Sequence, residues 1–132
     1  MRSQADRDAI NELSNNVIGA AIEVHRIMGP GLLESVYEEC LGLELSLSGV
    51  PSATQVHTPL QYKGVALKAA YRADMVVDSS LLVEVKSIEK LAPIHDAQLL
   101  TYLKLTNLPV GLLFNFNEIL LKNGLRRLVN GL

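Results

Sequence analysis

The segment Val110–Phe116 is nearly continuously apolar, and it constrains the fold of this chain more than any other feature of the sequence. A strand of this composition is typical of a sheet that is covered on both faces. A second apolar strand is predicted over Leu81–Ser87, and a helix over about Ile94–Thr106 separates the two. This order predicts parallel strands joined by a right-handed crossover, and therefore an α/β fold.

Two amphipathic helices are predicted before the first strand. Apolar residues recur at steps of three and four over about residues 7–28 and again over about residues 32–47. This spacing places them on one face of a helix. The Gly29-Pro30-Gly31 segment separates the two helices, because glycine and proline interrupt helical structure.

Three further strands complete the predicted elements. Thr54–Tyr62 and Val65–Val77 are predicted as strands, and Pro59 makes the first an edge strand, because proline donates no hydrogen bond to a neighbour. Asn123-Gly124 is a two-residue hairpin signal before a last strand over Leu125–Val129. The order of elements is therefore ααβββαββ, which predicts an α/β sandwich with a mixed sheet.

Length and composition limit the classes of protein. The 132 residues allow a single domain over residues 1–132, and the lone cysteine, Cys40, cannot form an internal disulfide. The polar, acidic start is unlike a signal peptide. No stretch reaches the roughly 18 apolar residues that would span a bilayer. We therefore expect a cytoplasmic protein without a membrane partner.

Charge is unevenly distributed, although the net charge is only −2. Residues 1–62 hold three basic and eight acidic side chains, whereas residues 63–132 hold nine basic and six acidic ones. A basic second half can form a surface that binds nucleic acid, but ordinary scatter of surface charge explains the same numbers. Charge alone does not decide between these interpretations.

Two carboxylates, Asp74 and Glu84, interrupt predicted strands that are otherwise apolar. If residues 78–80 form a three-residue loop, Asp74 lies directly opposite Glu84, with Cβ atoms about 4.5–5.5 Å apart. Lys86 lies two residues beyond Glu84 and so points to the same face. Two like charges at this distance are unfavourable unless a positive group lies between them.

A divalent cation would satisfy this arrangement. Mg²⁺ prefers oxygen ligands, and Asp74, Glu84 and the main-chain carbonyl of Val85 can supply them. Such an ion would neutralise a phosphate oxygen, while Lys86 would orient or deprotonate the attacking water and stabilise charge on the phosphate. A structural salt bridge of the two acids with Lys86 explains the same residues, and the spacing alone favours it.

Three further residues bear on this choice. Gln98 and Tyr102 are one turn apart on the helix that follows Lys86, and Glu34 lies in the first turn of the second helix. Surface and core positions explain Gln98 and Tyr102, and a favourable interaction with the helix dipole explains Glu34. In the functional interpretation, Gln98 and Tyr102 hydrogen-bond a phosphate or a water, and Glu34 supplies a third carboxylate.

Together these residues resemble a known pattern. Asp74 followed by Glu84-Val85-Lys86 resembles the signature of the PD-(D/E)XK nuclease superfamily, with Ala73 in place of the proline. Gln98–Tyr102 is similar to the QxxxY motif of its RecB-like exonuclease branch. Gly31–Tyr37 matches the motif of the GxxExxY protein family, a small bacterial group within that superfamily. The resemblance extends over about residues 10–129, with the motifs in the same order.

The resemblance implies a restriction-endonuclease-like three-layer sandwich with a mixed four-stranded sheet flanked by helices. It implies that Asp74 and Glu84 bind the metal and that Lys86 is the catalytic lysine. It further implies an acidic residue from the helix before the sheet, Glu34, and a supporting pair, Gln98 and Tyr102. The implied activity is Mg²⁺-dependent hydrolysis of phosphodiester bonds, with DNA as the expected substrate.

Two hypotheses of function follow. The first is a nuclease that uses Mg²⁺ or Mn²⁺ and cleaves DNA, with RNA as an alternative substrate. Its candidate phosphate contacts are Lys63, Lys68, Arg72, Lys90, Lys104, Lys122, Arg126 and Arg127. The second is a non-catalytic nucleic-acid-binding or regulatory module that acts through a partner protein. An aromatic content of 5% favours the second, because it offers few platforms for stacked bases. Apolar residues on the first two helices are also compatible with a homodimer.

Overall fold

The computed structural model describes residues 2–132 and contains one five-stranded sheet with helices on its faces. The helices are α1 (Gln4–Met28), α2 (Glu34–Leu47) and α3 (Pro93–Thr106), and a short 3₁₀ helix, η1, spans Leu121–Gly124. The strands are β1 (Ser52–Tyr62), β2 (Val65–Val77), β3 (Leu81–Lys86), β4 (Val110–Asn115) and β5 (Leu125–Val129).

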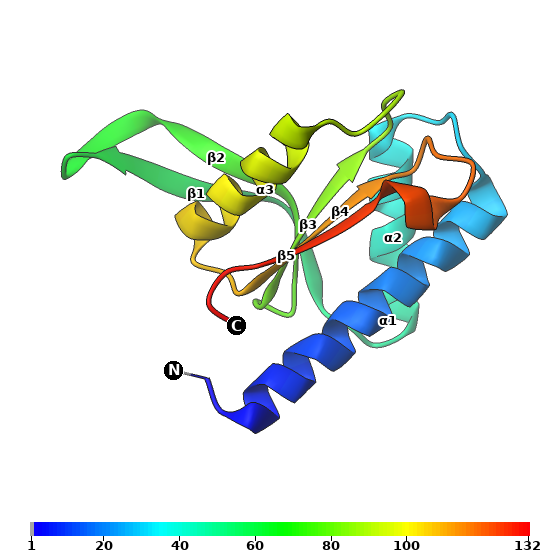
Figure 1. The fold of residues 1–132 in the computed structure, drawn as a ribbon, viewed down its shortest axis with the longest axis horizontal. Coiled ribbons are helices and arrows are strands. Elements are labelled where there is room, and N and C mark those ends of the chain that lie inside the picture. Colours follow the sequence, from blue (N-terminus) through cyan, green and yellow to red (C-terminus); the bar gives the residue numbers. More distant parts are fainter. Residues whose placement is uncertain (1) are drawn as a thin grey trace.

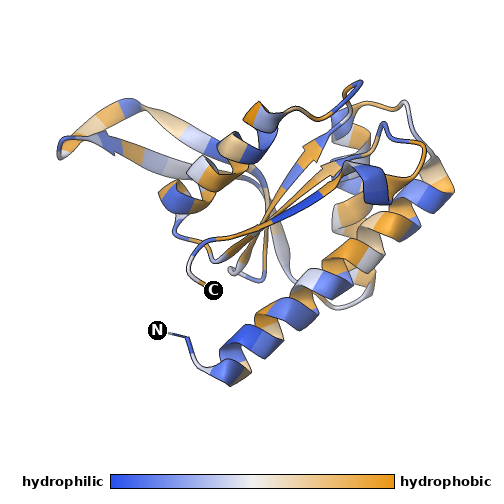
Figure 2. Ribbon diagram, in the orientation of Figure 1, coloured by the Kyte–Doolittle hydropathy of each residue, from blue (hydrophilic) through white to orange (hydrophobic). Residues whose placement is uncertain are grey.

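The sheet separates two hydrophobic clusters, so the molecule has three layers (Figure 1). Helices α1 and α2 cover one face through side chains such as Val17 and Leu41. Helix α3 covers the other face through Leu99 and Leu103. Strands β3 and β4 are buried except for Lys86, and Figure 2 shows that they are largely apolar. The predicted α/β sandwich is confirmed.

The strand order is β1-β2-β3-β4-β5, in which β3 and β4 are parallel and every other neighbouring pair is antiparallel. The parallel pair confirms the prediction from the strand–helix–strand order, and β1 lies at the edge, as Pro59 predicts. The sheet has five strands and not the four that the resemblance implied, because β5 pairs with β4 over Val110–Phe114.

The connection between β4 and β5 corrects a second prediction. Residues 116–124 separate these strands, so Asn123-Gly124 is not a two-residue hairpin. Phe116 turns into the core, where its ring stacks on Tyr37 with centroids 4.4 Å apart. Gly124 instead ends η1 against the β4 terminus, where an added Cβ would lie 2.6 Å from the carbonyl oxygen of Asn115. The burial of Phe116 in the core therefore outweighs the preference of Asn123-Gly124 for a two-residue hairpin turn.

The first helix begins three residues earlier than predicted. Ser3 Oγ accepts the N–H of Asp6 at 3.1 Å, and the Asp6 carboxylate accepts the N–H of Ser3 at 3.3 Å. These bonds form a capping box, which starts the helix at Gln4. None of the helices within residues 2–132 combines the length and hydropathy needed to cross a membrane.

Strands β1 and β2 continue beyond the rest of the sheet as a two-stranded arm, which we define as residues 56–73 (Figure 1). Strand β2 pairs with β3 over Met75–Val77, so within residues 2–132 the outer part of β2 has β1 alone as a neighbouring strand. Residues 61–70 at the end of the arm are all exposed.

Candidate active site

Asp74 lies where β2 changes the face to which its side chains point. Tyr71 and Ala73 belong to the hydrophobic cluster beneath α3, whereas Met75 packs with α1 and α2. Residues two apart in a regular strand share a face, so the alternation shifts at Asp74. At the same level of β1, between Thr54–Met75 and Val56–Ala73 in the register, Gln55 has a φ of +52°. This left-handed conformation is uncommon outside glycine and asparagine.

The β2–β3 ladder ends just before Asp74. Met75 pairs with Val83, as the predicted three-residue loop requires, but Asp74 and Glu84 do not extend the ladder. Instead, Oδ2 of Asp74 accepts the backbone N–H of Val85 at 2.9 Å. The other oxygen, Oδ1, has no hydrogen-bond partner within residues 2–132. The predicted Asp74–Glu84 pairing is therefore replaced by a side-chain contact to the next residue along β3.

Glu84 lies on the α3 side of the sheet and is only 8% exposed. The hydroxyl of Tyr71 donates a hydrogen bond to Glu84 Oε1. The Tyr71 ring stacks on Tyr102 of α3, with centroids 4.2 Å apart. Tyr102, predicted as a supporting residue, thus touches the ring that holds Glu84.

Lys86 ends β3 and is half-buried. Among the described residues no ion pair joins Lys86 to a carboxylate, although its charge acts on Asp74 and Glu84. A closed structural salt bridge, the simpler interpretation of the sequence, is therefore not formed. Gln98 is half-buried on α3, and its side chain makes no hydrogen bond in the part of the chain that the structure describes.

Glu34 lies at the first position of α2, next to the end of β3. Its Oε1 accepts the backbone N–H of Ser87 at 3.2 Å, and Ser87 Oγ donates to the carbonyl of Leu32 at 2.6 Å. These bonds attach the loop before α2 to the strand that carries Glu84 and Lys86. Glu34 is exposed, so it lies at the rim of the candidate site.

Tyr37, the tyrosine of the Gly-x-x-Glu-x-x-Tyr segment, is fully buried. Its hydroxyl donates to the carbonyl of Gly29 at 2.6 Å and accepts the N–H of Leu32 at 3.0 Å. Both partners belong to the loop between α1 and α2. Tyr37 therefore shapes the loop that places Glu34 at the start of α2.

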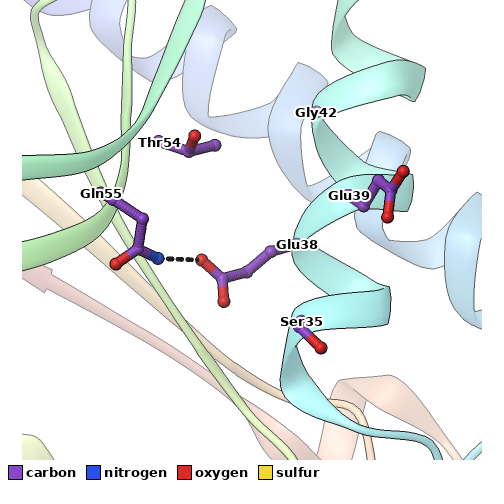
Figure 3. A pocket seen from close by; sticks show the side chains of 6 residues that line it. All are labelled: Ser35, Glu38, Glu39, Gly42, Thr54 and Gln55. Atoms are coloured by element: carbon purple, nitrogen blue, oxygen red, sulfur yellow. Dashed lines mark hydrogen bonds between the residues drawn. The ribbon is translucent and has the colours of Figure 1, made fainter.

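Sequence reasoning missed Glu38 and Tyr71. Glu38 follows Glu34 by one helical turn, and its Oε1 accepts a hydrogen bond of 2.8 Å from Nε2 of Gln55 (Figure 3). The pocket between α2 and β1 is lined by Ser35, Glu38, Glu39, Gly42, Thr54 and Gln55. The four-residue spacing from Glu34 was the available signal for Glu38. Tyr71 carried no such signal, because its contact with Glu84 depends on the tertiary structure.

A family model described as the PD-(D/E)XK nuclease superfamily matches residues 11–128. The chain belongs to this superfamily. No curated protein and no solved structure gives a significant match to it. The family match confirms the resemblance at the level of the superfamily, while membership of the narrower GxxExxY group stays a prediction. Membership of a nuclease superfamily points to nuclease activity and to a nucleic-acid substrate.

The carboxylates of this PD-(D/E)XK chain disfavour one another's ionised forms. Burial raises the pKa of Glu84 to about 7; the Lys86 charge opposes this rise and the Glu38 charge adds to it. Burial likewise raises the pKa of Asp74, and the nearby Glu34 carboxylate raises it further. The pKa of Glu38 is raised by burial and by Asp74. Such a group of acids is stabilised by an added cation.

The donor atoms of the site fit a hard divalent cation. Within residues 2–132 no three His, Cys, Asp or Glu side chains are already arranged to hold a metal ion. Asp74 and Glu84 nevertheless offer two partly desolvated carboxylates, and one Asp74 oxygen lacks a hydrogen-bond partner among the described residues. Mg²⁺ is commonly held by one or two carboxylates, with water and substrate phosphate as its other ligands. The described residues of the site therefore offer two carboxylate ligands but no complete protein cage for a divalent cation.

Proposed function

We propose that the chain is a single-domain nuclease that hydrolyses phosphodiester bonds of DNA and depends on a divalent cation, with Mg²⁺ as the expected ion. The observation that carries this proposal is the junction of β2 and β3. There the charge of Lys86 acts on both Asp74 and Glu84, yet no ion pair neutralises Lys86 within the described chain. Superfamily membership over residues 11–128 supports the same function.

In this proposal Asp74 and Glu84 hold the cation, and the main-chain carbonyl of Val85 is the third protein ligand. When bound, a divalent cation neutralises negative charge on the phosphate and makes a water molecule more acidic. Lys86 donates a hydrogen bond to the attacking water and stabilises the charge that develops on the phosphate oxygens. Ionised Asp74 and Glu84 are required, so their raised pKa values set the lower pH limit of activity.

The remaining predicted residues act around this centre. Glu34 lies at the rim and adds negative charge that attracts the cation. Gln98 is proposed to donate a hydrogen bond to a phosphate oxygen, because it lies one turn before Tyr102 on α3. Tyr102 acts as a positioning residue through Tyr71, which holds Glu84.

Cleavage assays with plasmid and linear DNA test the proposal. We expect cleavage with Mg²⁺ or Mn²⁺ and none with EDTA. Lys86→Met removes a charge that stabilises the transition state, so the rate should fall by about 100-fold or more. Lys90→Met, which changes an exposed lysine four residues further on, is the matched control: it removes a candidate phosphate contact, so it should weaken DNA binding and leave the cleavage rate at saturating DNA unchanged. Equal activity of Lys86→Met and the wild-type protein would show that a contaminant cuts the DNA.

A non-catalytic nucleic-acid-binding module is the second candidate. The lack of a ready three-ligand metal cluster within residues 2–132 favours it. This alternative predicts DNA binding that is unchanged by EDTA, by Asp74→Asn and by Lys86→Met, with no cleavage under any metal condition. The same cleavage and binding measurements therefore separate the two functions.

A further inference from the structure

Residues 61–70 of the arm (residues 56–73) are all exposed, and only the base of the arm contributes to the hydrophobic core. Val56, Tyr71 and Ala73 at the base contact the cluster beneath α3. The apolar side chains of Tyr62 and Val65 at the tip are 64% and 65% exposed. A long exposed ribbon of this kind tends to pair with other chains, which is a hazard for a folded protein. That this chain nevertheless carries such a ribbon points to a binding role.

The charge of the arm is of one sign. Lys63, Lys68 and Arg72 are all exposed, and no Asp or Glu occurs between Glu44 and Asp74. The whole chain, in contrast, has a net charge of −2. Three cations on an acid-free ribbon form a local surface that attracts phosphate groups.

The arm ends at the candidate site, so it can bring a bound strand to the chemistry. Strand β2 carries Lys68 and Arg72 and then, two residues later, Asp74. The β1–β2 register is irregular between Pro59 and Gln61, so the ribbon is only as long as the seven steps from Tyr62 to Gln55 on β1, or roughly 23 Å at about 3.3 Å per residue. This length corresponds to about two-thirds of a helical turn of B-form DNA, 34–36 Å.

The arm is a two-stranded ribbon, an element that a groove of duplex DNA can accept. A major groove about 12 Å wide admits a two-stranded β-ribbon. Around Lys68, β2 carries three small side chains, Ala66, Ala69 and Ala70, together with the exposed Leu67. At the tip, the Lys63 ammonium lies 5.5 Å from the centre of the Tyr62 ring, which holds this charge at the end of the ribbon.

We propose that the arm lies in the major groove of duplex DNA and holds it against the site at Asp74, Glu84 and Lys86. This inference rests on the proposed nuclease function and extends it to a double-stranded substrate. The cations contact the phosphates that border the groove, and Arg72 contacts the phosphate nearest to the site.

A second copy of this chain is a less suitable partner for the arm than duplex DNA. Two arms placed side by side would bring six cations together without an acidic partner. Proline on an edge strand also deters pairing with another strand, and Pro59 lies in the exposed edge strand β1. The positive charge of the arm and the proline in its edge strand therefore both favour an anionic partner over a second copy of this chain.

Fluorescence anisotropy with a labelled 30-base-pair duplex in EDTA tests the arm without cleavage. The double variant Lys63→Gln/Lys68→Gln removes two proposed phosphate contacts and leaves the site intact. We expect about tenfold weaker binding or more at 0.1 M salt, and a slope of log K against log[salt] that is smaller by about 2. Lys104→Gln/Lys122→Gln removes the same charge from exposed positions outside the arm. The sequence alone also offered these two lysines as phosphate contacts, whereas docking through the arm predicts that their loss changes both quantities far less. Equal losses in the two variants, or no loss in the arm variant, would overturn the proposal.

Two other ligands test the choice of duplex DNA. A single strand of the same length offers no groove, and the narrow major groove of duplex RNA excludes a ribbon. Both should bind more weakly than duplex DNA and respond less to Lys63→Gln/Lys68→Gln. Tighter binding of either one, or a dimer seen by light scattering that the arm variant abolishes, would show that the arm has a different partner.

A small chromogenic phosphodiester separates the arm from the proposed function. It reaches the site without touching the arm, so the arm variant should cleave it at the wild-type rate while it cuts long duplexes more slowly. If the wild-type protein cleaves no substrate but the binding difference persists, the nuclease function fails and the arm stands. If DNA is cleaved and the arm variant cuts long duplexes as fast as the wild-type protein, the arm fails and the nuclease function stands.

Discussion

The hydroxyl of Tyr71, at the base of the arm, donates a hydrogen bond to Oε1 of Glu84 in the buried strand β3. The same Tyr71 ring stacks on Tyr102 of α3. These two contacts connect the arm, the crossover helix and the candidate metal ligand. A change at Tyr71 therefore tests whether the support of Glu84 matters for activity.

We expect Tyr71→Phe to raise the lower pH limit of cleavage. The change removes the donor to Glu84 and keeps the ring stack, and loss of a hydrogen bond to the ionised carboxylate raises the pKa of Glu84. The cleavage rate at pH 7 should fall several-fold and recover at higher pH. Tyr62→Phe alters an exposed tyrosine of the arm and is the control. A pH–rate profile for Tyr71→Phe identical to the wild-type profile would contradict the positioning role.

The stability of the metal-free protein should fall as the pH rises through neutrality. Burial raises the pKa of Glu84 from 4.5 to about 7, so between these values the folded protein binds a proton that the unfolded chain releases. The stabilisation from protonated Glu84 is complete below pH 4.5 and is lost as the pH rises through about 7. At 1.36 kcal/mol per pKa unit, the loss is up to about 3 kcal/mol.

Thermal denaturation in EDTA across pH 4.5 to 8.5 measures this effect. Glu84→Gln cannot ionise at this position, so its melting temperature should fall less over the range than that of the wild-type protein. The raised pKa of Asp74 contributes in the same direction in both proteins. Parallel curves for the two proteins would show that Glu84 titrates at its ordinary pKa.

Because Gln55 has a left-handed backbone, we expect glycine to be more stabilising than alanine at this position, which is the reverse of their order at an ordinary strand position. Gln55→Gly and Gln55→Ala both remove the amide that binds Glu38, so their difference reports only the backbone at a φ of +52°. Gln55→Gly should be more stable by about 1 kcal/mol in urea denaturation, because glycine adopts this conformation without steric cost. At Gln61, an exposed β1 residue without a positive φ, the order should reverse. The same order at both positions would refute the strain at Gln55.

We expect Tyr37→Phe to lower the stability of the fold and to have little direct effect on the cleavage reaction. The change leaves the carbonyl of Gly29 and the N–H of Leu32 without their hydroxyl partner. The free energy of unfolding should fall by about 1–3 kcal/mol. Urea denaturation measures this, with Tyr62→Phe as the control. Normal stability combined with lost cleavage would instead assign Tyr37 a direct role in the reaction.

Much of the fold was predictable because its signals are local. The apolar run at Val110–Phe116 predicted a buried strand, and the helix before it predicted the parallel pairing of β3 with β4. Hydrophobic periodicity depends only on residues close in the sequence, and burial of the apolar face is the main force that forms each element. The acidic residues Asp74 and Glu84 were conspicuous for the same reason, since charge is costly in an apolar strand.

The tertiary structure decided the features that depend on residues distant in the sequence. The side chains of β2 change face at Asp74, beside the left-handed Gln55 of the neighbouring strand β1. The residues around Asp74 form no sequence pattern that predicts this change. Burial of Phe116 against Tyr37 overrode the turn signal at Asn123-Gly124. The contact of Tyr71 with Glu84 likewise exists only after β2 and α3 meet on one face of the sheet. Side-chain periodicity specifies which face of each element is buried, whereas the packing of those faces specifies which polar groups meet.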